Sequence, residues 1–262
     1  MRFRIVRRGG VLALVAVAAL LAGVVPASAA PGDGSAYGVK VDVALLGANV
    51  VHVGPLAAAS TSGPTSNSLA SATVPGIVTA GVINTSADKD PNTGAVTAEA
   101  STAYVGLPLL VALGTVRAKL IDAKCTATQS GEDGTTTLTD AKFGALGTLA
   151  VTPAPNSTVA VTVPGVGNVA TLILNEQIHN GDGSLTVNAI HLHLLGGSGV
   201  GAIGSGDVII SSATCGPAGL PMPVASGAGL WIGIGLLGAI AVPLGVGVGV
   251  VRRRRTSAAT AA

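Results

Sequence analysis

The sequence of 262 residues has few charges, few aromatic rings and only two cysteines. Charged residues make up 10% of the chain and aromatic residues 2%, whereas hydrophobic residues make up 48%. A chain this apolar and this poor in charge does not have the composition of a disordered protein. Two cysteines are too few for a disulfide-stabilised miniprotein. The 38 glycines do not recur at every third position, which excludes collagen.

Positive charge is scarce in the middle of the chain. Eight of the fourteen basic residues lie at the two ends, in residues 2–8 and 252–255. The segment between them has six basic and all twelve acidic residues, which gives it a net charge of −6. Nucleic-acid binding requires a basic surface, so this acidic body argues against nucleic acid as a partner.

The first 29 residues have the order of charge and hydrophobicity that is typical of a secretory signal peptide. Four arginines between Arg2 and Arg8 precede an apolar run over residues 11–25, and Ala27-Ser28-Ala29 supplies small residues before a cleavage site. The apolar run is short for a membrane span, so an uncleaved anchor is the less favoured alternative. We therefore expect residues 1–29 to be removed during export.

Residues 228–251 form an uncharged, mostly apolar stretch of 24 residues near the C-terminus. As a helix it would be about 36 Å long, which exceeds the ~30 Å hydrocarbon core of a bilayer. Arg252 to Arg255 follow at once, and such a cluster stays on the cytoplasmic side. The pattern predicts a single-pass protein of the cell membrane, with an extracellular domain over residues 30–217, a linker over 218–227, a transmembrane helix over 228–251 and a basic cytoplasmic tail over 252–262.

Two other features concern this C-terminal segment. A sortase signal has the same overall shape, but the Thr-Gly pair that a sortase cleaves is absent after Leu220, so a retained helix is favoured. The predicted helix also contains two Gly-x-x-x-Gly spacings, Gly229/Gly233 and Gly245/Gly249, which allow two helices to pack closely. Self-association through this glycine-rich helix is therefore a hypothesis.

Between the two ends, apolar and polar residues alternate with a period of two. The clearest runs are Val39 to Leu45, Val116 to Leu120 and Val159 to Val163. Such alternation is typical of half-buried β-strands. Further strands are predicted over residues 49–53, 77–84, 95–105, 135–151, 168–175, 184–195 and 207–214.

No segment of this body shows a long helical period, and turn residues separate the predicted strands. The fold class that we predict is therefore all-β, as an antiparallel sandwich or a barrel-like domain. Residues 57–75, rich in Ser, Thr and Ala, are predicted to form a long mobile loop.

Cys125 and Cys215 are the only cysteines, and both lie in the part expected outside the cell. An oxidising exterior favours a single disulfide between them, with two separate thiols as the alternative. Each cysteine ends a predicted strand, so two neighbouring strand ends would bring the sulfur atoms within bonding distance.

The most specific motif runs from residue 172 to residue 194. It contains Leu-Ile-Leu-Asn-Glu-Gln, a glycine-rich turn, and then Leu-Thr-Val-Asn-Ala-Ile-His-Leu. This motif resembles the choice-of-anchor P family of actinobacterial surface proteins. Residues 36–39, 118–125 and 208–215 also fit, so the resemblance covers most of residues 35–215. It implies a surface domain that is joined to varied C-terminal anchors, and it implies no biochemical activity.

His191 and His193 are two residues apart on a predicted strand, so both side chains are expected on one face of the sheet. This spacing can bind a metal ion, and Glu176 is a further candidate ligand. His179, three residues after Glu176, is expected on the opposite face. The alternative is that the histidines form hydrogen bonds to Glu176 or Asn188 and fix the register of a hairpin.

Asp88, Asp90, Asn92 and Glu99 have spacings that resemble a calcium-binding loop. The glycine, Gly94, comes one residue late, and no helical pattern flanks the segment. A hairpin turn rich in Asp, Asn and Gly is therefore the alternative.

No constellation for catalysis occurs in the sequence. A Gly-x-Ser-x-Gly elbow is absent, and no set of Ser, His and Asp is placed for nucleophilic attack. Gly-x-Gly-x-x-Gly matches begin at Gly199 and Gly233 but lack a strand–turn–helix context, so we expect no cofactor. The favoured interpretation is a non-enzymatic surface module that contacts an envelope protein or polymer. An extracellular module that binds a small ligand or a cation is the alternative.

Overall fold

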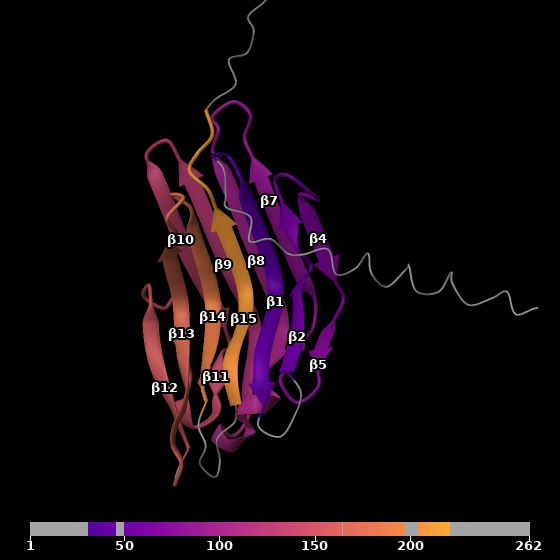
Figure 1. The fold of residues 1–262 in the computed structure, drawn as a ribbon, viewed down its shortest axis with the longest axis vertical. Coiled ribbons are helices and arrows are strands. Elements are labelled where there is room, and N and C mark those ends of the chain that lie inside the picture. The colour runs from indigo at the N-terminus through magenta and orange to yellow at the C-terminus, as the bar shows by residue number, and fades with distance from the viewer. Residues whose placement is uncertain (1–30, 46–49, 164, 197–203, 221–262) are drawn as a thin grey trace, which may run out of the picture.

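The computed structural model describes residues 31–45, 50–163, 165–196 and 204–220. Nearly all regular structure in these residues is β-strand, and all of their strand pairs are antiparallel. Two sheets lie face to face, one in front of the other in Figure 1. The all-β prediction is confirmed, and of the two architectures that the sequence allowed, the sandwich is the one that forms.

The first sheet, sheet A, has seven strands and joins the two ends of the described chain. Its strands follow the order β12 (Ser157–Val163), β13 (Gly167–His179), β14 (Leu185–Leu195), β15 (Gly204–Cys215), β1 (Gly34–Leu45) and β2 (Val50–Leu56), with β3 (Ala59–Ser60) also paired to β1. β15, the last strand in the chain, thus pairs with β1, the first strand, in the middle of the sheet.

The second sheet, sheet B, has eight strands and is built from the middle of the chain. Its main path is β10 (Gly131–Thr139), β9 (Val116–Thr128), β8 (Val96–Gly106), β6 (Val78–Ala80) and β5 (Ala72–Val74), while β7 (Ile83–Lys89) pairs with β8 and β4 (Ser66–Leu69), and β11 (Lys142–Phe143) pairs with β9. Short 3-10 helices cover Pro108–Leu113 and Gly144–Leu146.

The core lies between the sheets and consists of small aliphatic side chains. Val39, Val41 and Val43 are at most 1% exposed, as the alternation predicts. Phe143 is the only aromatic side chain among the fully buried residues that the structure describes. β-Branched residues pack well on a pleated surface, so a core without large rings is still compatible with a sandwich.

In sheet A, the alternation of inward and outward side chains shifts by one residue at the same position along four neighbouring strands. Asn175 and Ser211 have positive φ angles of 49° and 55°, and Ala189 lies between them on β14. Gly38 occupies the same level on β1. We call these four residues the phase-shift row. Two successive residues point into the core here, such as Ala189 and Ile190, both 0% exposed. Residues three apart across the row therefore project from the same outer face.

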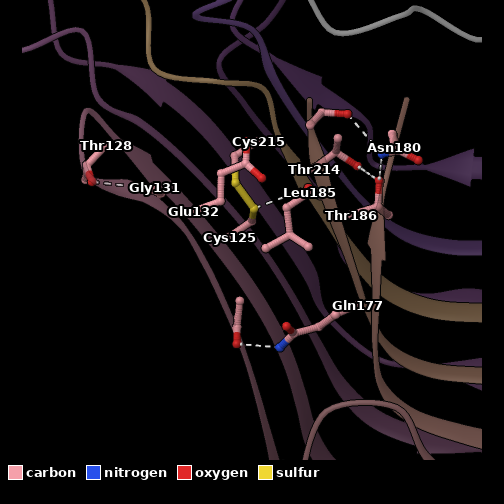
Figure 2. The surroundings of a disulfide bond; sticks show 12 residues. Cys125, Thr128, Gly131, Glu132, Gln177, Asn180, Leu185, Thr186, Thr214 and Cys215 are labelled. Atoms are coloured by element: carbon pink, nitrogen blue, oxygen red, sulfur yellow. Dashed lines mark hydrogen bonds between the residues drawn. A yellow bond between two sulfur atoms is a disulfide. The ribbon is translucent and has the colours of Figure 1, made fainter. Parts of the chain in front are cut away.

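The predicted disulfide forms and joins the two sheets. Cys125 on β9 is bonded to Cys215 at the end of β15, and Leu185 lies beside the sulfur atoms (Figure 2). The two cysteines are 90 positions apart in the sequence. The bond therefore closes a long loop and connects β15, an inner strand of sheet A, to β9 of sheet B.

Hydrogen bonds provide two further links between the sheets. Gln177 Nε2 on β13 donates to the Gly134 carbonyl on β10 at 2.7 Å (Figure 2). The Ser211 hydroxyl donates to the Ile121 carbonyl at 2.8 Å and lies 2.8 Å from the Thr102 hydroxyl. These bonds satisfy polar groups that the packed sheets shield from water.

Two segment predictions were wrong. Residues 57–75 contain the short strands β3, β4 and β5 instead of one long loop. These strands have two to four residues, which is too short to show an alternating pattern. Residues 135–151 do not form one strand, because β10 ends at Thr139 and the chain turns at Asp140, whose φ is 49°.

The predicted signal peptide over residues 1–29 and the predicted transmembrane helix and tail over 228–262 lie outside the described residues. Within the part of the chain that is described, no helix is both long and apolar enough to span a bilayer.

Candidate metal centre on the outer face of sheet A

A connected cluster of polar side chains lies on the outer face of sheet A. His191 is at its centre, with Nδ1 2.8 Å from Glu176 Oε2 and Nε2 2.8 Å from Asp207 Oδ1. The same Asp207 oxygen is 2.7 Å from His193 Nδ1. Asn188 donates from Nδ2 to Glu176 Oε2 at 2.7 Å. The structure thus brings together Glu176, His191 and His193, as the sequence suggests, and adds Asp207.

Strand pairing places these side chains. Glu176 on β13 lies opposite Asn188 on β14, and His193 lies opposite Asp207 on β15. In a strictly alternating strand, Asn188 and His191 would point to opposite faces, because they are three residues apart. The phase-shift row crosses β14 between them. Both side chains therefore reach the outer face, and Glu176 contacts both.

The solvent exposure of the side chains differs between the two sides of the cluster. The side chains of Glu176 and His191 are 14% and 17% exposed, whereas those of Asp207 and His193 are 42% and 48% exposed. A dissolved ion can therefore reach Asp207 and His193 from solvent. The sheltered Glu176–His191 pair holds its geometry behind them.

Electrostatics favour a positive charge at His191. Burial by itself lowers the pKa of His191, but the hydrogen bonds with Glu176 and Asp207 outweigh burial and raise this pKa above its ordinary value. Burial likewise raises the pKa of the Glu176 and Asp207 carboxyls, and hydrogen bonds from the cluster outweigh it, so both pKa values lie below their usual range. The cluster therefore stabilises a cation between two carboxylates.

A second ion-pair group adjoins the cluster. Asp42 on β1 lies directly opposite Asp207, and its two oxygens are 2.7 Å from His52 Nδ1 and 2.8 Å from Lys40 Nζ. Carboxylates at opposed positions repel each other unless cations lie beside them. The three carboxylates of this region, Asp42, Asp207 and Glu176, outnumber its one lysine, Lys40. This part of the outer face is therefore negative and attracts cations.

The donor atoms of His191, His193 and Asp207 lie within 4.8 Å of one another. Imidazole nitrogens and carboxylate oxygens bind Zn²⁺ and other first-row divalent ions, and three protein ligands leave a fourth position for water. An ion at ~2.1 Å from each donor in tetrahedral geometry separates the donors by about 3.4 Å. The contacts of Asp207 with His191 and His193 would thus widen by about 0.7 Å as the ion replaces the shared protons.

Glu176 has the position of a carboxylate that supports a metal-binding histidine. It contacts His191 Nδ1, while Nε2 faces Asp207. A carboxylate on the far nitrogen fixes the ring and its tautomer, and it strengthens the bond of the near nitrogen to a metal. The bond from Asn188 holds Glu176 itself. The same contacts also agree with the alternative from the sequence, a network that fixes the hairpin register.

The other candidate ligands lie elsewhere. His179 is on the opposite side of β13 from Glu176, with Nδ1 4.0 Å from Glu132 Oε2. Asp90 accepts a bond from the Asn92 backbone N–H at 2.8 Å, which stabilises a turn between β7 and β8. Glu99 on β8 pairs with a lysine of β9 at 3.9 Å.

The four residues of the predicted calcium loop, Asp88, Asp90, Asn92 and Glu99, are therefore not gathered around one point. Among the described residues, the histidine–aspartate group on sheet A is the only set of three or more such ligands.

Asp207 is the ligand that the sequence analysis missed. It begins the predicted strand over residues 207–214, but the sequence gives no register between this strand and β14. A signal was present, because an acidic residue opens the strand that follows the His191-x-His193 strand across a glycine-rich connection. Only the pairing of β14 with β15 places it opposite His193.

We found no protein-family model, no curated protein and no solved structure that matches the chain. The resemblance to the choice-of-anchor P family therefore stays a prediction, and function has to be inferred from the geometry.

Proposed function

We propose that the chain is an exported cell-surface module, held to the membrane by its C-terminal segment, which binds a divalent transition-metal ion such as Zn²⁺. The observation that carries the proposal is the position of His191. One ring nitrogen contacts Glu176, and the other faces Asp207, which also contacts His193. Binding, rather than catalysis, is the role that we assign to this site.

Several features support the proposed location. Residues 1–29 have the pattern of an export signal, and residues 228–255 combine an apolar stretch with a basic end. The Cys125–Cys215 disulfide is of the kind that persists in oxidising compartments and is rare in the cytosol. The likeness to choice-of-anchor P surface proteins points the same way.

Metal binding would link three neighbouring strands of the outer face. His191 and His193 come from β14, Asp207 comes from β15, and Glu176 supports the site from β13. The ligands must lose their protons before the metal binds, so affinity is expected to fall at acidic pH.

Isothermal titration tests the proposal. The full-length protein in detergent is treated with EDTA, dialysed and titrated with Zn²⁺. We expect one saturable site, at least tenfold weaker binding in His193→Ala and Asp207→Asn, and 10- to 100-fold weaker binding in Glu176→Gln. His52→Ala is the matched control, because it removes another histidine–aspartate pair of the same sheet. It is expected to bind Zn²⁺ as the wild type does.

Absence of binding in the wild type would refute the metal centre and leave the cluster as a hydrogen-bond network that fixes strand register. An equal loss in His52→Ala and His193→Ala would also refute it, because binding would then not depend on the cluster.

A further inference from the structure

A surface groove lies on sheet B, separate from the metal centre on sheet A. Tyr104 of β8, Arg117 and Lys119 of β9, and Lys142 of β11 line a hollow of about 580 Å³. Arg117 and Lys142 also line a second hollow of about 410 Å³. Because both hollows are lined by Arg117 and Lys142, they lie next to each other, and we refer to the pair as the groove.

The groove concentrates positive charge on an acidic domain. Arg117, Lys119 and Lys142 are three of the six basic residues between the charged ends of the chain. Arg117 and Lys142 occupy directly opposed positions on paired strands, and Lys119 is two residues further along the same strand. Like charges so placed repel one another. The arrangement is therefore one that an anion would stabilise.

These cations outnumber the one carboxylate that lines the same hollow. All three are exposed, and among the described residues no carboxylate lies within ion-pair distance of Arg117, Lys119 or Lys142. Asp140 lines the same hollow without forming an ion pair to them. By contrast, Lys124 on the same strand is paired with Glu99 at 3.9 Å.

An exposed aromatic ring stands beside the cations. Tyr104 is 69% exposed and has a φ of 51°, which is unusual for a bulky residue. A tyrosine ring that is open on one face can stack against the C–H face of a sugar ring.

The groove lies at the end of the sandwich away from the end of the described chain. Gly219 accepts a bond from Gln129, in the turn that follows β9. Arg117 lies at the other end of β9. It precedes Cys125 by eight residues, and eight residues of β-strand are about 26 Å long. Figure 1 shows β11 at the end opposite to the segment that follows β15. The groove is therefore at the end of the sandwich far from the proposed membrane tether.

We propose that this groove binds an anionic polysaccharide, with the cations on its carboxylate or phosphate groups and Tyr104 on a sugar ring. Arginine and lysine bind both kinds of anion, and arginine can do so with two parallel hydrogen bonds. The distance from the proposed tether favours a polymer over the lipid surface in which the chain would be anchored.

Binding of defined polymers tests this inference. The full-length protein in detergent is immobilised and exposed, in EDTA, to polygalacturonate, dextran phosphate, uncharged dextran, polyglutamate and phosphatidylglycerol nanodiscs. We expect salt-sensitive binding of one or both anionic polysaccharides and none of uncharged dextran. Arg117→Gln/Lys142→Gln is expected to weaken that binding at least tenfold, whereas Lys124→Gln, the matched control on β9, leaves it unchanged.

Tyr104→Ala separates sugar recognition from simple charge. It is expected to weaken polysaccharide binding about fivefold and to leave any polyglutamate binding unchanged. Tighter binding to the nanodiscs than to either anionic polysaccharide would overturn the proposal, as would equal binding by the double variant and Lys124→Gln. Since EDTA removes metal throughout, failure of the metal centre would not affect these results.

Discussion

Asn188 and His191 contact the same oxygen of Glu176, although they lie three residues apart on one strand. Strict alternation would put them on opposite faces of the sheet. The phase-shift row at Asn175, Ala189, Ser211 and Gly38 changes the alternation in four adjacent strands at once. The support that Glu176 gives to His191 in the candidate metal centre thus depends on a backbone irregularity that the core maintains.

Ser211 tests the importance of this row for folding. Ser211→Gly keeps the left-handed backbone but loses the hydroxyl that bonds across the core, at an expected cost of about 1–3 kcal/mol in the free energy of unfolding. Ser211→Val also introduces a β-branched residue at a φ of 55°, which adds about 1–3 kcal/mol. Urea denaturation measures both values. Equal stabilities of the two variants would contradict the role of the backbone conformation.

At Gly38, the side chain of Ile83 leaves no room for a Cβ atom. A Cβ at this position would overlap Ile83 Cγ2, across the core on β7. Gly38→Ala should therefore lower the free energy of unfolding by about 1–3 kcal/mol through overpacking. Ile83→Ala should relieve the overlap, so the double variant should lose less than the sum of the two single losses. Simple additivity in thermal denaturation would show that the two sites are not coupled.

The hydrogen-bonded cluster predicts a specific pH dependence. Because the folded chain raises the pKa of His191 above 6.5, this residue adds stability at acidic pH and loses its contribution as the pH rises through the folded value. Folding lowers the pKa of Glu176 below 4.5 and that of Asp207 below 3.8. Each carboxylate therefore adds stability above that pH and loses this effect as the pH falls through its pKa in the folded chain.

The stability difference between wild type and His191→Gln should therefore be greatest between pH 4.5 and 6.5 and should shrink at alkaline pH. Urea denaturation in EDTA at several pH values measures it. A difference that does not vary with pH would contradict the charge assignment.

The disulfide is expected to contribute substantially to stability. Cys125→Ala/Cys215→Ala should lower the free energy of unfolding by about 4 kcal/mol, because the bond constrains a loop of about 90 residues in the unfolded chain. Thiol titration of the unreduced, denatured protein should find no free thiol. Two titratable thiols would show that the bond does not form in the native environment.

Much of the fold could be predicted from local pattern. Alternation identified the long strands, since each buries every second side chain. The two cysteines, each expected at a strand end, indicated the disulfide, although Cys125 lies within β9 and only Cys215 ends its strand. Strand order could not be predicted, because the pairing of β1 with β15 joins residues about 170 positions apart. The strands within residues 57–75 were missed because they are too short to show a period.

The site could be predicted only in part, for the same reason. The spacing of His191 and His193 placed them on one face, and a short hairpin made Glu176 a plausible partner. Asp207 required the register of β14 with β15, and the Glu176–His191 contact required the phase shift. The sequence does not reveal the positive φ angles at Asn175 and Ser211, because neither residue is a glycine, the residue that most clearly indicates such a backbone conformation.

His191, His193 and Asp207 are the proposed ligands of one divalent metal ion. Zinc X-ray absorption spectroscopy of the full-length protein, loaded with one equivalent of Zn²⁺, identifies such ligands. We expect nitrogen and oxygen ligands at ~2.0–2.2 Å with scattering from two imidazole rings, which His191→Ala/His193→Ala would abolish. A spectrum without imidazole scattering, or one that this double substitution leaves unchanged, would contradict this assignment.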